Sequence, residues 1–112
     1  MPVPHPLPDD LAELIARRFR AIAEPVRIRL LDRLRDGEAT VNDLAEQVGS
    51  SQQNVSKHLS VLADAGILAR RKDGNRVYYR IADEGVLTLC DNVCGSIERQ
   101  LATLNELVGA AR

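Results

Sequence analysis

The feature that most constrains the fold is a pair of short amphipathic segments in the middle of the chain, separated by a glycine-containing turn. Residues 41–48 have the apolar spacing of a short helix, and Gly49 ends it. A second helix, capped by Ser50 or Ser51, is expected to run to Ala65. Two short helices joined in this way have the spacing of a helix-turn-helix.

The hydrophobic period then changes from that of a helix to that of a strand. Residues 67–72 and 76–81 are expected to be strands, and Asp73-Gly74-Asn75 between them is a strong turn sequence. A helix-turn-helix followed by a basic two-stranded hairpin is a winged helix. The sequence therefore predicts a mainly α fold with a small β-hairpin (α+β).

Two further helices are expected before this pair. The first, capped by Asp9 or Asp10, should end near Ala23, and the second should run from Pro25 to about residue 36. Prolines occupy every second position from 2 to 8. Because proline fixes φ and lacks an N–H, this beginning of the chain is expected to be an extended arm.

The segment from residue 83 to residue 108 is expected to form one long helix. Its apolar residues step by 4, 3, 4, 3 and 4, the spacing of a coiled-coil-like seam: Cys90, Cys94, Ile97, Leu101, Leu104 and Val108. We call these six residues the apolar seam. In so small a protein, such a helix is better explained by a partner helix than by solvent. The simplest partner is a second copy of the chain across a two-fold axis.

Length and composition limit the class of protein. With 112 residues, 45% of them hydrophobic and 28% charged, the chain has the mix of an ordinary globule, and we expect an arm (1–8) followed by a single domain (9–112). No apolar run approaches the roughly 20 residues that span a bilayer, and no signal peptide is recognisable, so a cytoplasmic protein without a membrane partner is expected. No catalytic triad, phosphate loop or Cys-x-x-Cys motif indicates an enzyme.

The second helix of the central pair has one side suited to reading DNA. Six small or polar residues lie away from its apolar positions Val55, Leu59 and Leu62, and we call them the polar face: Ser51, Gln52, Gln53, Ser56, Lys57 and Ser60. Glutamine can bond bidentately to adenine, serine to several base edges, and lysine to guanine or phosphate. This pattern predicts a helix that enters the major groove.

Charge is unevenly distributed along the chain. Residues 51–81 hold six basic and two acidic side chains, net +4, whereas residues 82–112 hold two basic and five acidic ones, net −3. A basic middle favours a polyanionic partner, while the overall pI near 6.1 argues against indiscriminate coating of DNA. The hairpin should contact phosphates or the adjacent minor groove through Arg71, Lys72, Asn75 and Arg76.

Between residues 19 and 81 the chain resembles the ArsR/SmtB-type winged-helix repressors. The resemblance rests on Ala23–Leu31 (AEPVRIRLL), Asp43-Leu44-Ala45, Gln53–Leu59 (QNVSKHL), Leu62–Leu68 (LADAGIL) and Gly74–Tyr79 (GNRVYY). It implies a homodimer that binds a palindromic operator overlapping a promoter and releases it when a metal, metalloid or other stress signal is sensed. It also implies a dimer interface on the first and last helices, formed by Leu11, Leu14, Ile97, Leu101, Leu104 and Val108.

The family's sensing sites are not conserved in this chain. Where many members have Cys-Val-Cys-Asp-Leu, this sequence has Thr40-Val41-Asn42-Asp43-Leu44, so both thiolates are missing. No histidine follows His58, so a last-helix site of Asp/His and His/Glu pairs is missing as well. His58 itself matches a position common in the family, and we interpret it as structural or close to DNA.

Cys90 and Cys94 are the remaining candidates for sensing. On a helix their Cβ atoms lie about 5–6 Å apart, close enough to share a soft metal or metalloid ion but too far for an undistorted disulfide, which needs about 3.5–4.5 Å. Three uses stay open: apolar packing, soft-ion binding with a third donor from the other subunit, water or His5, and redox switching by a bridge between two copies.

Other functional classes also stay open at this stage. The protein could regulate transcription without an effector, or respond to redox or sulfur signals. It could use its winged helix only to bind another protein, and a separate corepressor protein is not excluded.

Overall fold

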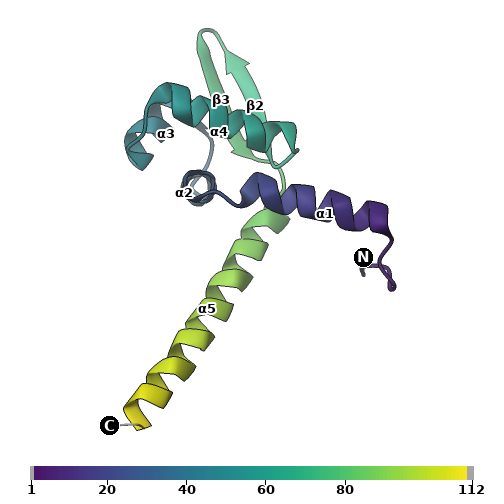
Figure 1. Cartoon of the computed structure of the whole chain (residues 1–112). Helices are drawn as coiled ribbons and strands as arrows, with labels where there is room; N and C mark the ends of the chain where they lie inside the picture. Colours follow the sequence, from purple (N-terminus) through teal and green to yellow (C-terminus); the bar gives the residue numbers. More distant parts are fainter. Residues whose placement is uncertain (1, 111–112) are drawn as a thin grey trace. The chain divides into compact units, whose positions relative to one another are not determined.

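The structure is a computed structural model that describes residues 2–110 (Figure 1). These residues form five helices and one three-stranded sheet. They divide into two compact units, one that ends at Ala82 and one that begins at Asp83. The first unit contains the predicted winged helix-turn-helix, which is confirmed, and the second contains one long helix.

Helix α1 spans Asp9–Ile22 and begins without a side-chain cap. Pro8 occupies the capping position in an extended conformation, and its fixed φ leads the preceding residues directly into the helix. The prediction that Asp9 or Asp10 caps α1 is therefore wrong. Both carboxylates lie in the first turn instead, where they interact favourably with the positive end of the helix dipole.

Helix α2 spans Pro25–Leu34, with the proline at a position where a helix loses nothing through the missing N–H. The carboxylate of Glu24 caps the helix by accepting a hydrogen bond from the backbone N–H of Val26 at 3.0 Å. The buried side of α2 consists of Leu30, Leu31 and Leu34.

Helices α3 (Val41–Val48) and α4 (Gln52–Asp64) form the helix-turn-helix (Figure 1). Thr40 caps α3 and Ser51 caps α4, each through a side-chain oxygen that accepts a backbone N–H. Gly49 has a φ of +68°, a left-handed conformation that glycine adopts without strain. It ends α3 and turns the chain towards α4.

Aliphatic side chains from α2, α3 and α4 and from the start of the sheet form the core. Those with less than 2% of their surface exposed are Leu30, Leu31, Leu44, Val55, Leu59, Leu62 and Ile67. Three of these seven belong to α4, so the helix with the polar face is also fixed to the core along its opposite side.

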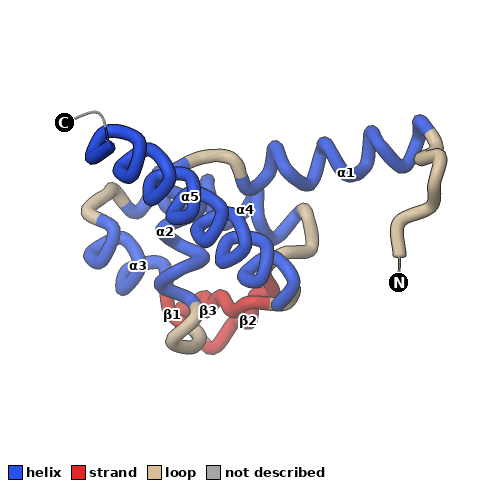
Figure 2. The backbone as a smooth tube through the Cα atoms, turned by 90° about the horizontal axis from the view of Figure 1, so that it is seen from below, coloured by secondary structure: helices blue, strands red, loops and turns tan. Residues whose placement is uncertain are grey.

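The sheet contains β1 (Ala39–Thr40), β2 (Leu68–Asp73) and β3 (Arg76–Ile81) in the order β1-β3-β2, all antiparallel (Figure 2). The sequence predicts the two longer strands, and the prediction of a two-stranded hairpin misses β1. That strand has only two residues, and its pairing with β3 depends on where the first helices place it.

The turn of the wing, which we define as residues 68–81, is shorter than predicted. Asp73 pairs with Arg76 across the hairpin, so Gly74 and Asn75 alone form the turn. Gly74 has a φ of +62°, as tight hairpin turns require.

Helix α5 spans Glu84–Ala110. At about 1.5 Å per residue its 27 residues extend for about 40 Å. Val86 and Leu87 are its buried residues among those described, and most of the helix beyond them is exposed. Within residues 2–110, none of the helices combines the length and apolarity that crossing a membrane requires.

Candidate DNA-binding surface

Helix α4 has two chemically different sides. Val55, Leu59 and Leu62 have no exposed surface. The six residues of the polar face all retain contact with solvent: Ser51, Gln52, Gln53 and Lys57 are exposed, and Ser56 and Ser60 are half-buried. A helix anchored along one side can present the other to a partner without losing its own packing.

Hydrogen bonds organise the beginning of α4. The Ser51 hydroxyl accepts a bond from the backbone N–H of Asn54 at 3.1 Å, so this predicted DNA-binding residue is also the helix cap. The Asn54 side-chain amide donates to the Ser50 hydroxyl at 2.8 Å. Asn54 is exposed on the first turn of α4 and lies outside the predicted polar face.

The strand register divides the predicted wing residues between two faces. Arg71 lies opposite Tyr78, and Asp73 opposite Arg76, while Lys72 lies opposite Val77. Because successive strand residues point to opposite faces, Arg71 and Arg76 share one face and Lys72 belongs to the other. The wing therefore carries cations on both faces rather than one patch of three.

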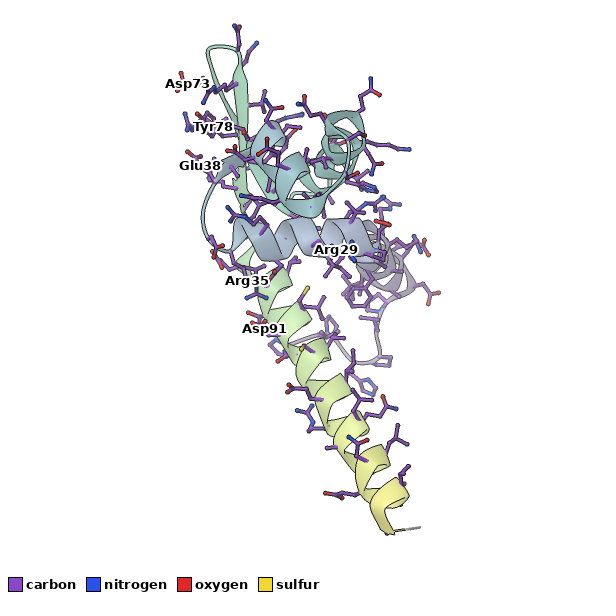
Figure 3. All side chains as sticks on the ribbon, turned by 90° about the vertical axis from the view of Figure 1, so that its left-hand side faces the viewer. Arg29, Arg35, Glu38, Asp73, Tyr78 and Asp91 are labelled. Atoms are coloured by element: carbon purple, nitrogen blue, oxygen red, sulfur yellow. The ribbon has the colours of Figure 1, made fainter. Side chains whose placement is uncertain are left out.

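Arg71 is held by partners from two other parts of the chain. Its guanidinium lies 4.5 Å from the centre of the Tyr78 ring and 2.6 Å from the Glu38 carboxylate, with Asp73 at 3.7 Å. Figure 3 shows Asp73, Tyr78 and Glu38 following one another along one side of the wing. Arg71 thus fixes the wing to the segment before β1.

This contact shifts both titrations in the directions that favour the ion pair. The hydrogen bond from Arg71 holds the pKa of Glu38 below its ordinary value; desolvation opposes this shift, and the charges of Arg71 and Arg80 lower the pKa further. The same hydrogen bond raises the pKa of Arg71. The sequence does not indicate this ion pair, because 33 positions separate Glu38 from Arg71.

Other cations of the surface are not compensated in this way. Among residues 2–110, no ion-pair partner is found for Lys57 on α4 or for Lys72 and Arg76 on the wing, and all three are exposed. Their charges are therefore not neutralised by an ion pair in this part of the chain, and they can pair with a ligand.

A hollow of about 400 Å³ joins the two parts of the surface. Gln52 from the start of α4 lines it together with Asn75 and Arg76 from the wing. Its remaining lining comes from the start of α3 and from the wing: Thr40, Val41, Asn42, Asp43 and Val77. The fold therefore brings predicted DNA-binding residues of the helix and of the wing to one place.

Exposed apolar side chains mark a different surface, on α5. The seam residues Ile97, Leu101, Leu104 and Val108 are each about half exposed, and Val93 and Leu107 extend this apolar strip. In the other unit, Leu14 on α1 is 57% exposed and Leu11 is half-buried. Apolar side chains at helical spacing and without cover are typical of an association surface.

Comparison with known proteins supports the fold and places the chain in a family. A family model described as a helix-turn-helix domain matches residues 22–71. The transcriptional regulator KmtR of Mycobacterium tuberculosis is 43% identical over 86 residues, which cover 77% of this chain and 66% of KmtR. The solved structure of the antimony-specific transcriptional repressor AntR is 36% identical with a TM-score of 0.75, over 85% of this chain and 86% of AntR.

A third similar protein is the homodimeric winged helix-turn-helix DNA-binding domain Mb0332 from Mycobacterium bovis, "a possible ArsR-family transcriptional regulator". It is 34% identical, with a TM-score of 0.73 over 82% of this chain and 85% of that domain. The chain belongs to the ArsR/SmtB family. This family consists of winged-helix transcriptional regulators, and this member spans slightly less than two thirds of the length of KmtR.

Within residues 2–110 of this ArsR/SmtB protein, the two thiols do not form a complete metal site. Cys90 is half-buried and Cys94 exposed, both as free thiols four residues apart on α5. Among residues 2–110 there is no cluster of three or more His, Cys, Asp or Glu side chains that could hold a metal ion. Soft ions in protein sites commonly take three or four ligands, and these two thiols alone do not supply them.

Proposed function

We propose that the protein is a homodimeric transcriptional repressor that binds a palindromic operator with α4 in the major groove. The observation that carries the proposal is the division of α4 into a core side with no exposure and a solvent-facing polar face next to the uncompensated cations of the wing. Gln52 and Gln53 can make bidentate bonds to adenine, and Lys57 can bond to guanine or to a phosphate.

The wing supplies contacts that fix position rather than sequence. Lys72 and Arg76 would lie against phosphates or in the adjacent minor groove, with Asn75 between them in the turn. Arg71, paired with Glu38 and stacked on Tyr78, gives the wing its orientation. Positioning contacts of this kind set the register in which α4 meets the bases.

A second copy of the chain completes the reading unit. The exposed apolar seam on α5 and the exposed leucine on α1 support self-association, as does the homodimeric state of the Mycobacterium bovis relative. Two recognition helices related by a two-fold axis would address half-sites about 34 Å apart, one turn of the duplex.

A second element of the proposal is that Cys90 and Cys94 receive the signal that changes operator affinity. Both lie in the apolar seam, and both are free thiols. A thiol-reactive or soft-ion signal at this place would change how two copies pack, and with it the spacing of their recognition helices. The similarity to a repressor named as antimony-specific supports a thiophilic signal; packing alone is the alternative.

The experiment that tests the proposal selects bound fragments from a random DNA pool. We expect one palindromic sequence to be enriched. Gln53→Ala should then lower affinity for it by about tenfold, since a good bidentate base contact contributes about 1–3 kcal/mol of discrimination. The matched control is Gln47→Ala, which removes another exposed glutamine, from α3. If no sequence is enriched and binding does not depend on salt, the protein-association function is favoured instead.

The selection, repeated with arsenite, a panel of metal ions and an oxidant, also tests the thiol pair. We expect release of the operator by at least one of these reagents, and no release in a Cys90→Ser/Cys94→Ser variant. Full release from that variant by every thiol-reactive reagent would show that the two cysteines only pack.

A further inference from the structure

One arginine connects three helices of the winged unit. Arg27 lies on α2, and its Nη1 donates to the backbone carbonyls of Ala21 at 3.1 Å and Arg20 at 3.4 Å, at the end of α1. Its Nε donates to Nδ1 of His58, on α4, at 3.0 Å. A cation is favourable at the carbonyl end of a helix, so Arg27 caps α1 while it holds α4.

His58 is placed between two charged groups. Its side chain is 12% exposed, and Nε2 lies 3.9 Å from the Glu24 carboxylate. Since Nδ1 accepts from Arg27, a neutral ring must carry its proton on Nε2, directed towards Glu24. Glu24 is itself fixed by its bond to the N–H of Val26. One tautomer and one orientation of the imidazole therefore suit both the Arg27 guanidinium and the Glu24 carboxylate.

His58 lies on a third side of α4, distinct from the core side and from the polar face. Val61 and Ala65 follow it at helical spacing, and both line a groove shared with α1. Along the same side, an Arg18 guanidinium on α1 donates to the carbonyl oxygen of Ala65. Arg18 and Arg27 thus tie this third side of α4 to α1 and α2, while Lys57, directly before His58, faces solvent.

We propose that Arg27 and His58 are positioning residues for DNA recognition, which set the rotation of α4 about its axis by tying it to the end of α1. This rests on the proposed function, because it assigns these residues to the operator-reading helix. Apolar packing of Val55, Leu59 and Leu62 resists separation of α4 from the core but is non-directional. The Arg27–His58 bond is directional and fixes the angle at which the polar face meets the bases.

The geometry explains why arginine is needed at position 27. Its guanidinium holds N–H groups in a rigid planar fork, so one side chain can donate to carbonyls of α1 and to a ring nitrogen of α4 at once. A lysine keeps the charge and can reach one of these acceptors only. Arg27→Lys therefore separates the bridge from the charge.

The test compares Arg27→Lys, His58→Leu and His58→Asn in the full chain, with Arg29→Lys as the matched control on the exposed side of α2. Fluorescence anisotropy gives the affinity for the operator and for an unrelated duplex. We expect Arg27→Lys and His58→Leu each to lower operator affinity about tenfold, the effect of one hydrogen bond to a charged group. Affinity for the unrelated duplex should change less than about twofold.

Two further results distinguish positioning from general stability. His58→Asn, which keeps an acceptor near the position of Nδ1, should recover most of the operator affinity, and the double variant Arg27→Lys/His58→Leu should be no weaker than either single one. Nitrogen-15 NMR of the unaltered protein should show His58 with its proton on Nε2, a result that does not depend on any variant folding.

The proposal is overturned if the proton lies on Nδ1, or if folded Arg27→Lys and His58→Leu proteins bind the operator as well as the unaltered chain. A loss that is equal for operator and unrelated duplex would also overturn it. Failure of the proposed function itself gives a different result, because the unaltered chain would then show no preference for any duplex.

Discussion

Replacing Leu101 and Leu104 with alanine should dissociate the proposed homodimer and leave each protomer folded. Both side chains belong to the apolar seam of α5, and they are 54% and 51% exposed in a single protomer. About half of each side chain is therefore available for burial by a second copy. Alanine has the highest helix propensity, so the substitutions should preserve α5 itself.

The size of the effect follows from this exposure. Complete burial of a leucine side chain contributes about 1.5–3 kcal/mol, so burial of the exposed half contributes about 1 kcal/mol. Two positions in each of two protomers give about 4 kcal/mol. At about 1.4 kcal/mol for each factor of ten, the dimer dissociation constant should rise about 10³-fold.

Sedimentation equilibrium measures the dissociation constant, and circular dichroism shows whether the helices persist. The matched control is Asn92→Ala/Glu106→Ala, which changes two exposed residues on the other side of α5. It should leave the dissociation constant within about threefold of the original. If the leucine variant associates as tightly as the unaltered chain, the seam is not in the interface and the reasoning from its exposure fails.

Three other predictions concern the winged unit. Arg76→Ala should reduce the slope of log K, the DNA association constant, against log salt concentration by about two, since each protomer loses one phosphate contact. If a titration between 50 and 200 mM salt shows an unchanged slope, that contact is excluded. Leu59→Ala should lower the free energy of unfolding by about 2–5 kcal/mol in urea titrations, because the side chain has no exposure, and a loss below about 1 kcal/mol would contradict this. Glu38→Gln should speed amide exchange in the wing at neutral pH. Folding lowers the pKa of Glu38, so the ion pair contributes stability above the ordinary pKa of 4.5 and loses it as pH falls through the folded-state pKa. The difference in exchange rate between the two proteins should therefore vanish in acid. A difference that persists in acid would contradict the ion pair.

The helices of the winged unit could be predicted because their ends are specified locally. The Thr40 and Ser51 caps and the left-handed Gly49 each act within a few residues of the helix end that they define. The same locality explains the error at α1, where two acidic residues resemble a cap but Pro8 immediately before them already starts the helix. Where two local signals compete, the sequence does not show which one prevails.

Contacts between distant residues could not be predicted in this way. Strand β1 has two residues, too few for a recognisable period, and helices α3 and α4 separate it in the sequence from its partner strand β3. Arg27 and His58 are 31 positions apart, and Glu38 and Arg71 are 33 apart. Each partner alone resembles an ordinary surface residue, and only the fold shows that they meet.

Pairing of this kind changes how the charge of the surface should be interpreted. The net charge of +4 over residues 51–81 counts Arg71 fully, yet Glu38, which lies outside that range, compensates it together with Asp73. Lys57, Lys72 and Arg76 have no such partner in the described part of the chain. Among the predicted DNA-binding cations, attraction to a duplex should therefore depend on these three side chains, whereas Arg71 determines where the wing presents two of them. Loss of Arg71 should then weaken operator binding mainly through geometry, and loss of any of the other three mainly through charge.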